Sequence, residues 1–453
     1  MISLATIGIL GLLTLFVLLA LRMPVALSML FVGFTGTIIA NANKFLSIGM
    51  DSDQAWSRGW KIAYSNLAGE TFEAASNFNL LVIPMFVLMG SIAGASGMSR
   101  DLFTAAYRWM GHLKGGLASA TIAACAGFAA LSGSSLASAV TMGRVALPQM
   151  KRYKYADPLA TGSVAAGGTL GFLIPPSGGM IIYAVLTEQS IGKLFMAGII
   201  PGIVLTLLFI AAIYLVVLRK PESGPPGERA TSSEKWSSLL GALPILLVVV
   251  VTIGGMYTGF FTPVEASSVG AFFTFVVALI MGRLDLQKMK VIILESMSTT
   301  ATVFLIIIAA FVFIPFMALT ELPAQLVTIL TSLPIGDFGV LLIIILVYLF
   351  LGMFLEGIAM LVLTIPVVIP IAIGLDWDLI WFGIIIVIIL EMGMISPPVG
   401  INVFVVKSIA PDVPMGQIFR GIWPFWFAMA AMIGLLILFP QIALFLPDKL
   451  VGG

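Results

Sequence analysis

The sequence predicts an all-α polytopic membrane protein built from two inverted repeats. Three observations lead to this fold class: the composition, the recurrence of long uncharged apolar stretches, and short signatures that occur once in each half. Of the 453 residues, 60% are hydrophobic and 9% are charged, whereas soluble domains carry about 25% charged residues. A transmembrane helix needs about 20 mostly apolar residues, and residues 2–21, 199–218 and 338–355 contain no charge at all. The lipid bilayer is therefore the expected solvent.

The rarity of reactive side chains excludes several classes of function. Cys125 is the only cysteine and His112 the only histidine, which excludes a disulfide framework, a thiolate metal site and histidine-based catalysis or proton relays. The net charge of +1 gives no indication of nucleic-acid binding. We expect the first apolar stretch to be a permanent span, because it lacks the basic segment that begins a secretory signal.

Hydrophobicity places the spans, and the basic residues orient them. With the N-terminus outside, all but five of the 22 Lys and Arg residues fall on the cytoplasmic side, as the positive-inside rule requires. Both termini are therefore expected on the periplasmic face. The five exceptions are Lys44, Arg58, Lys61, Lys193 and Lys449. The spans are expected near residues 3–21, 24–42, 79–97, 156–187, 197–218, 240–258, 263–282, 298–319, 379–406 and 421–445.

Two polar segments interrupt the apolar pattern. Residues 219–238 read RKPESGPPGERATSSEKWSS, a run of Pro, Gly, Ser and alternating charge that indicates a cytoplasmic linker. Residues 43–77 contain Trp56, Trp60 and other aromatic residues, which are typical of a helix that lies along a membrane surface. We therefore expect this segment to form an arm at the outer surface.

Signatures repeated in the same order divide the chain into two repeats, residues 1–218 and 239–453, each expected to contain scaffold spans, an arm, a hairpin and a broken helix. The copies are roughly 220 to 240 residues apart, and in the predicted topology each element runs opposite to its partner. Inverted repeats of this kind are common in secondary transporters with alternating access. The paired signatures begin at Pro24 and Pro263, Ile83 and Ile314, Leu173 and Ile395, and Gly198 and Gly421.

Each repeat also contains an apolar segment that we expect to enter and leave the membrane on one side. Residues 115–150 are too long for one span and are basic at both ends, which favours a re-entrant hairpin. Its tip is a small polar sequence, Leu131 to Ser138. The counterpart in the second repeat is residues 336–374, with a tip near Gly352 to Gly357.

A span interrupted by two consecutive prolines follows each hairpin. Residues 156–187 contain Pro175-Pro176, and residues 379–406 contain Pro397-Pro398. Each pair removes two backbone donors and frees upstream carbonyls, so the helix must break. A break at membrane depth persists where it lines a cavity or binds a group that satisfies it, and carbonyls with serine hydroxyls suit a hard cation. The alternative is a simple kink beside a packing face of small residues.

Two carboxylates are predicted deep in the second repeat. Glu356 stands at the second hairpin tip and Glu391 just before the second break. Buried acids of membrane proteins act through a cation, a proton or an orienting hydrogen bond. The alternative is a glutamate that caps a helix or faces a water-filled vestibule.

The motifs together resemble the large permease subunit, DctM type, of tripartite ATP-independent periplasmic (TRAP) transporters, over nearly the whole chain. The resemblance implies an elevator-type transporter of the bacterial inner membrane, driven by Na⁺, that takes up a small solute, often a carboxylate. It also implies two partners: a small four-span membrane subunit, expected as a separate chain, and a periplasmic substrate-binding protein. The motifs are Gly115-Gly116-Leu117-Ala118, Ser132-Gly133-Ser134-Ser135, Ile174-Pro175-Pro176-Ser177, Phe195-Met196-Ala197-Gly198 and Ser396-Pro397-Pro398-Val399-Gly400-Ile401-Asn402.

The same resemblance implies the site residues. Sodium is expected at the first hairpin tip with the first break, and at the second tip with the second break. Substrate contacts are expected between the tips, where no arginine stands in either broken helix to hold a carboxylate. The sodium residues implied are Ser132, Ser134, Gly171, Ile174, Pro176, Gly352, Gly393, Ser396 and Val399, and the substrate residues are Ser135, Ser177 and Asn402.

Three other functions stay open on the sequence alone. A single-component sodium- or proton-coupled anion transporter, or a sodium/proton antiporter, could share this architecture without a periplasmic protein. An intramembrane enzyme is disfavoured by the single histidine and by the paired motifs. A channel seldom needs inverted halves with two hairpins.

Overall fold

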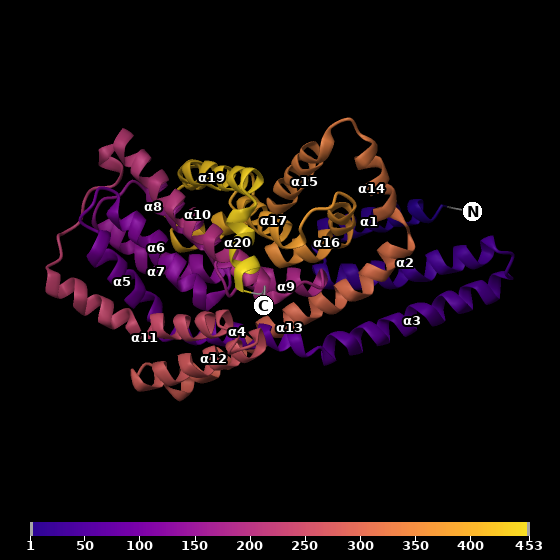
Figure 1. Cartoon of the computed structure of the whole chain (residues 1–453), viewed down its shortest axis with the longest axis horizontal. Helices are drawn as coiled ribbons and strands as arrows, with labels where there is room; N and C mark the ends of the chain where they lie inside the picture. The colour runs from indigo at the N-terminus through magenta and orange to yellow at the C-terminus, as the bar shows by residue number, and fades with distance from the viewer. Residues whose placement is uncertain (1–2, 451–453) are drawn as a thin grey trace. The chain divides into compact units, whose positions relative to one another are not determined.

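A computed structural model describes residues 3–450, and every regular element among them is helical (Figure 1). Nine helical segments of this range are long and apolar enough to cross a membrane, so the all-helical polytopic class is confirmed. The predicted periplasmic ends of the chain, residues 1–2 and 451–453, lie outside the described residues. In chain order the helices are α1 Leu4–Ala20, α2 Val25–Ser47, α3 Ser52–Ser76, η1 Phe78–Leu81, α4 Val82–Ala95, α5 Met98–Met110, α6 Gly116–Ser132, α7 Ser135–Arg152, α8 Asp157–Leu173, α9 Gly178–Leu186, α10 Ile191–Arg219, η2 Pro221–Ser223, α11 Ser232–Tyr257, α12 Pro263–Ile280, α13 Leu286–Leu319, α14 Leu322–Ser332, α15 Gly336–Gly352, α16 Gly357–Gly374, α17 Leu379–Met394, α18 Ile401–Ile409, α19 Met415–Leu438 and α20 Gln441–Leu450.

The chain forms two compact units. The first comprises residues 3–80, 299–344 and 358–379. Within it α2 and α3 lie side by side (Figure 1). Glycines allow the backbones to approach: a Cβ atom on Gly33 would stand 2.9 Å from the carbonyl oxygen of Val312, and one on Gly59 would stand 2.8 Å from that of Ile38. Small residues at helix crossings are how membrane helices pack closely.

The second unit comprises residues 81–298, 345–357 and 380–450 and contains every predicted site residue. Its central helix is α8, which packs against α6, α7 and α19 and is buried from Leu159 to Leu173. The crossing of α8 and α19 is the closest of these contacts, because a Cβ atom on Gly421 would stand 1.8 Å from the carbonyl oxygen of Pro158. Helix α8 thus contacts three other helices, and α19 crosses it near its beginning.

The predicted segments correspond to helices with shifted bounds. The expected hairpins match α6 with α7 and α15 with α16, and the expected arm matches α3. Helix α11 begins at Ser232, inside the predicted linker, because Thr231 and Glu234 form a capping box. The sequence contains this signal, Thr-x-x-Glu before an apolar run, so residues 232–238 are helical although their composition predicts a linker.

The two halves differ at one place where the repeats predict equivalence. In the first half the arm helix ends at Asn77, whose side-chain oxygen accepts from the amide of Asn79 at 3.0 Å. In the second half α13 runs unbroken for 34 residues. A local side-chain bond of this kind competes with the helix, so Asn77 gives the physical reason for the difference.

Candidate functional site

The turn between α6 and α7 lies directly against the break between α8 and α9. The amide of Gly178 donates to the carbonyl oxygen of Gly133 at 3.1 Å. A Cβ atom on Gly133 would stand 2.8 Å from the carbonyl oxygen of Pro176, and one on Gly171 would stand 2.6 Å from that of Ser134. Gly133 also has a positive φ of 58°, which glycine adopts at little cost. The first predicted tip and the first proline pair therefore form one contact.

The turn between α15 and α16 makes the corresponding contact with the break between α17 and α18. The amide of Gly400 donates to the carbonyl oxygen of Met353 at 3.2 Å. The backbones of Gly352 and Gly393 touch, because a Cβ atom on Gly352 would stand 3.0 Å from the Cα atom of Gly393. The structure thus contains two places where a turn between helices contacts the segment around a proline pair, which we call junction 1 (residues 132–135 and 171–178) and junction 2 (residues 352–357 and 393–400).

The two junctions have the same construction. Gly171 and Gly393 each stand four residues before the first proline of a pair and touch the neighbouring turn. The peptide bond within each proline pair is cis. Because prolines have no amide hydrogen, the carbonyls of Gly171 and Met394 lack the donor that a continuous helix would supply at i+4. Backbone oxygens are therefore available at both junctions.

The serine hydroxyls at junction 1 already have partners. Ser177 begins α9, where its Oγ donates to the carbonyl of Phe172 and accepts from the amide of Met180. The Oγ atoms of Ser132 and Ser138 share a hydrogen bond of 2.7 Å. Ser134 is the exception, because its Oγ accepts only a long bond of 3.4 Å from Ala137 as the cap of α7. Of the predicted hydroxyl ligands, Ser134 is the least engaged.

At junction 2 the hydroxyl of Ser396 is held by two partners. Its Oγ donates to the carbonyl of Met392 at 2.7 Å and accepts from Nε1 of Trp426 at 3.0 Å. The amide of Ser396 donates to the carbonyl of Gly393 at 2.9 Å. A hydroxyl oxygen has two lone pairs, so one remains for a cation.

A polar cluster of Ser135, Glu391 and Asn402 joins the elements of the two junctions. Glu391 is 1% exposed and Asn402 is fully buried. Glu391 interacts electrostatically with Ser135, Asn402 and Glu356, but no polar atom of the described residues lies in hydrogen-bond geometry to either of its carboxylate oxygens or to the amide of Asn402. Buried polar groups are almost always paired, so this cluster is an exception, as are single atoms of His112, Tyr257 and Ser296 in the same unit.

Two of the three predicted substrate residues meet in the structure, and the third has a different role. Ser135 and Asn402, predicted as substrate contacts, meet at Glu391, whereas the hydroxyl of Ser177 is used within the first break. Sequence reasoning missed Trp426, whereas Ser138 and Met353 lie within the predicted tips but were not predicted as site residues. Only Trp426 had a readable signal, since an indole in an apolar helix needs an acceptor for its N–H. The residues at the two junctions are Ser132, Ser134, Gly171, Ile174, Pro176 and Ser177, and Gly352, Glu356, Gly393, Ser396 and Val399.

The sequence is similar to one described family over nearly its whole length. The model of that family, "Tripartite ATP-independent periplasmic transporter, DctM component", matches residues 12–442. The C4-dicarboxylate TRAP transporter large permease protein of Pseudomonas aeruginosa is 37% identical over 386 residues, which cover 85% of this chain and 90% of that protein. The sialic acid TRAP transporter large permease protein of Vibrio cholerae is 33% identical, with 95% and 96% covered.

One longer relative and one solved structure add to this picture. The isethionate TRAP transporter permease protein DctMQ of Oleidesulfovibrio alaskensis is 32% identical, and the match covers 83% of this chain but 59% of that protein. The YdaH transporter of Alcanivorax borkumensis has a similar structure, with a TM-score of 0.63 at 15% identity over 87% of this chain and 91% of that one. At this identity the likeness shows the fold alone.

Proposed function

Because this chain belongs to the DctM component family of tripartite ATP-independent periplasmic transporters, we propose that it carries a small carboxylate-bearing solute across the bacterial inner membrane in symport with Na⁺. The family makes the chain a multi-pass permease and not an enzyme. Na⁺ is here a transported co-substrate. The observation that carries the proposal is the pair of junctions, where backbone oxygens and hydroxyls gather beside a buried carboxylate.

Sodium binding at the junctions follows from the available ligands. Na⁺ is a hard cation and prefers oxygen ligands, as Ca²⁺ and Mg²⁺ do. The carbonyl of Gly171 and the hydroxyl of Ser134 offer such oxygens at junction 1, and the carbonyls of Met394 and Val399 offer them at junction 2. No group of three or more His, Cys, Asp or Glu side chains among residues 3–450 could hold a metal ion, which favours a monovalent cation held largely by backbone.

The proposed solute site lies between the junctions, at Ser135 and Asn402. The unpaired amide of Asn402 can donate to a carboxylate and accept from a hydroxyl. Glu391 would repel an anion, so we infer that Na⁺ must bind before or together with the solute. This order gives a physical reason for coupling, because the cation converts a repulsive site into an attractive one.

Relatives support an anionic solute and separate partners. The names of three relatives specify C4-dicarboxylate, sialic acid and isethionate, which are all anions. The name of the longest joins an M to a Q component, and this chain covers 59% of it, which supports a small membrane subunit as a second chain. We propose the periplasmic binding protein on the basis of the tripartite family.

The proposed membrane arrangement is the one drawn from the basic residues. In it the two turns are tips of re-entrant hairpins, and α8 with α9 and α17 with α18 are broken transmembrane helices. The mobile part of an elevator would be formed by the junctions, and residues 1–218 and 239–453 would form the inverted repeats. The linker at residues 219–238 would be cytoplasmic.

Reconstitution tests the proposal. The chain is placed in liposomes with and without a small membrane subunit and a periplasmic substrate-binding protein of the same transporter family, and uptake of radiolabelled succinate and N-acetylneuraminate is measured under a Na⁺, K⁺ or H⁺ gradient. We expect uptake of one solute, only under the Na⁺ gradient and only with both partners. Uptake by the chain alone would instead support a single-component transporter, and uptake driven by H⁺ without Na⁺ would overturn sodium coupling.

A further inference from the structure

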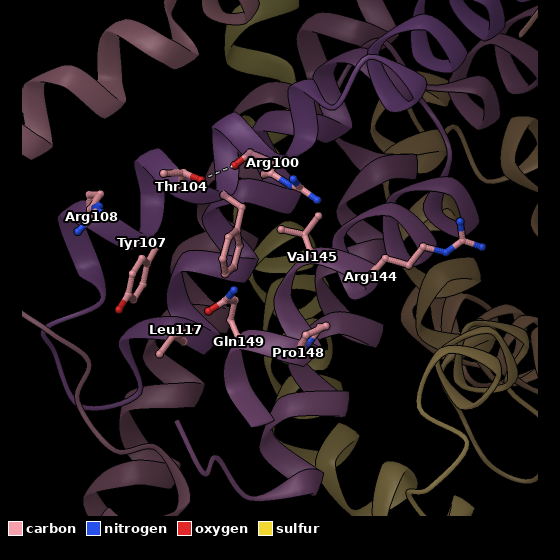
Figure 2. Close-up of a pocket in the computed structure, with 10 residues that line it drawn as sticks. Arg100, Thr104, Tyr107, Arg108, Leu117, Arg144, Val145, Pro148 and Gln149 are labelled. Carbon is pink, nitrogen blue, oxygen red and sulfur yellow. Dashed lines mark hydrogen bonds between the residues drawn. The ribbon is translucent and has the colours of Figure 1, made fainter. Parts of the chain in front are cut away.

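A basic pocket lies between α5, α6 and α7, away from both junctions. Its volume is about 510 Å³. Figure 2 shows Arg100 on one helix and Arg144 on another, with both long side chains extending toward the same side of the view, while Tyr107 and Arg108 stand on the other side. The proposed function uses none of these side chains. We call this cavity the Arg100–Arg144 pocket.

The two arginines that name the pocket are not neutralised. Arg108 pairs with Glu234 at 3.2 Å, and Asp101, the neighbour of Arg100, pairs with Arg283. Within residues 3–450, no carboxylate stands within ion-pair distance of Arg100 or Arg144. Asp101 and Glu234 are therefore engaged elsewhere, while Glu228 lies near Tyr107 and Asp157 and Asp412 line a second cavity with Arg144. The lining of the pocket itself contains arginines and no carboxylate, so it has an excess of positive charge.

The other polar side chains of the pocket add no negative charge. Tyr107 donates to the hydroxyl of Tyr153 at 2.7 Å, and burial together with this bond raises the pKa of Tyr107 to about 12. Tyr107 is thus neutral at physiological pH, as is the amide of Gln149, which also lines the pocket. An anion would meet two guanidinium groups and the neutral amide of Gln149.

The other part of the lining is apolar. Phe103, Leu117, Val145 and Pro148 face the cavity between the polar groups. A free inorganic anion gains nothing from such side chains, whereas an amphiphile can place its charged group at the arginines and its hydrocarbon against the apolar residues. Basic pockets between membrane helices on the cytoplasmic side are typical sites for anionic lipid headgroups.

We propose that the Arg100–Arg144 pocket binds the headgroup phosphate of an anionic phospholipid from the cytoplasmic leaflet. The side of the membrane follows from the proposed topology, in which α5 and the base of the first hairpin face the cytoplasm. Arg100 and Arg144 contact the phosphate, and the apolar residues contact the glycerol and the first acyl carbons. The ligand belongs to the phosphatidylglycerol and cardiolipin class.

Native mass spectrometry of the whole chain in mild detergent tests this site without any transport measurement. The chain is incubated with phosphatidylglycerol, cardiolipin or phosphatidylcholine, and the bound lipid is counted for wild type, Arg100→Gln, Arg144→Gln and the double variant. Arg152→Gln is the matched control, because Arg152 is exposed at the end of α7 and does not line the pocket. Size-exclusion profiles report whether each variant is folded.

We expect wild type to retain the two anionic lipids over phosphatidylcholine. Each pocket substitution should lower their apparent affinity roughly fivefold, as one basic residue does near an anionic membrane surface, and Arg152→Gln should leave it unchanged. Equal retention in all folded variants would overturn the site. Displacement of the lipid by millimolar inorganic phosphate, with no preference for anionic over zwitterionic lipid, would overturn the lipid as its ligand. Failure of transport alone would change neither result.

Discussion

The main-chain amide of Gly400 donates a hydrogen bond of 3.2 Å to the carbonyl of Met353, and so joins the second hairpin turn to the second helix break. The first junction contains the same bond, from Gly178 to Gly133 at 3.1 Å. In each case the amide of the second residue after a proline pair finds its acceptor in a neighbouring turn. Each turn therefore replaces part of the hydrogen bonding that the prolines remove.

The close approach of Gly352 and Gly393 gives the first prediction. Gly393→Ala would place a Cβ atom 2.8 Å from the Cα atom of Gly352, and backbone atoms cannot yield as a flexible side chain can. We expect a loss of about 1–3 kcal/mol in stability, as for other overpacked contacts, with a lower melting temperature and slower sodium-dependent uptake. Thermal unfolding and uptake at matched surface abundance measure the two effects.

Gly434→Ala on α19 is the matched control for this prediction. A Cβ atom there meets nothing within 4 Å, so alanine should leave stability unchanged or raise it by roughly 0.5–1 kcal/mol, as expected in a helix interior. An unchanged melting temperature and uptake rate in Gly393→Ala would show that junction 2 is looser than the structure indicates.

The helix ends and the first turn of the site could be predicted from the sequence. Proline pairs end helices because of their covalent structure, and α8 and α17 end at Leu173 and Met394, two and three residues before their pairs. The glycine and serine of the first tip likewise predicted a turn, and α6 ends at Ser132. These predictions succeeded because each depends on the residues at the position itself.

The contacts between residues far apart in the sequence could not be predicted in this way. Trp426 bonds to Ser396 across 30 residues, and Ser135 meets Glu391 and Asn402 across more than half the chain. Such pairs depend on how the helices pack, and one sequence contains no signal for that packing. The sequence also did not predict that α13 is one continuous helix. The repeat suggested a break there, but the break in the first half depends on Asn77.

The second prediction concerns the two serines proposed as sodium ligands. Ser134→Ala removes a hydroxyl whose only described bond is the long cap to Ala137, so the sodium concentration for half-maximal uptake should rise by roughly 5- to 150-fold, equivalent to about 1–3 kcal/mol for one buried polar contact. Ser396→Ala should raise it less and lower stability more, because this hydroxyl holds Trp426. Sodium titrations of uptake and thermal unfolding separate the two effects.

Trp426→Phe is the control for Ser396. It removes the indole donor and keeps an aromatic ring, so it should reproduce the stability loss of Ser396→Ala without its change in sodium dependence. Sodium titrations that stay the same in both serine variants would exclude their hydroxyls as ligands and leave packing as their role.

The third prediction concerns topology. Impermeant maleimide should label Ser57→Cys in the arm helix α3, but not Ser232→Cys at the start of α11, in cells with an intact inner membrane and a permeabilised outer one. Both positions are exposed, and the native Cys125 is buried. The experiment uses a Cys125→Ala background, in which no native cysteine can react with maleimide. Permeabilising the inner membrane should make Ser232→Cys reactive. The reverse pattern of labelling would invert the proposed orientation.

The last prediction concerns the charge of Glu391. Glu391→Gln keeps the shape of the side chain and removes a negative charge that has no described hydrogen-bond partner. At an effective dielectric constant of about 20, a unit charge about 8–15 Å from a bound cation changes the free energy of cation binding by about 1–2 kcal/mol. We therefore expect the sodium concentration for half-maximal uptake to rise roughly 5- to 30-fold. Sodium titrations of uptake measure this directly.

Two further measurements distinguish the effect of the charge of Glu391 from the effect of its packing. Glu295→Gln is the control, because Glu295 is exposed on α13 and its loss changes the net charge equally, so its sodium dependence should match wild type. A buried carboxyl that is not paired with a cation is neutral, so without Na⁺ the melting temperature of Glu391→Gln should match wild type. A matched melting temperature with unchanged sodium dependence would mean that Glu391 does not help to attract the cation. The inferred order of Na⁺ before solute would then fail, because it depends on an ionised Glu391 whose charge Na⁺ neutralises.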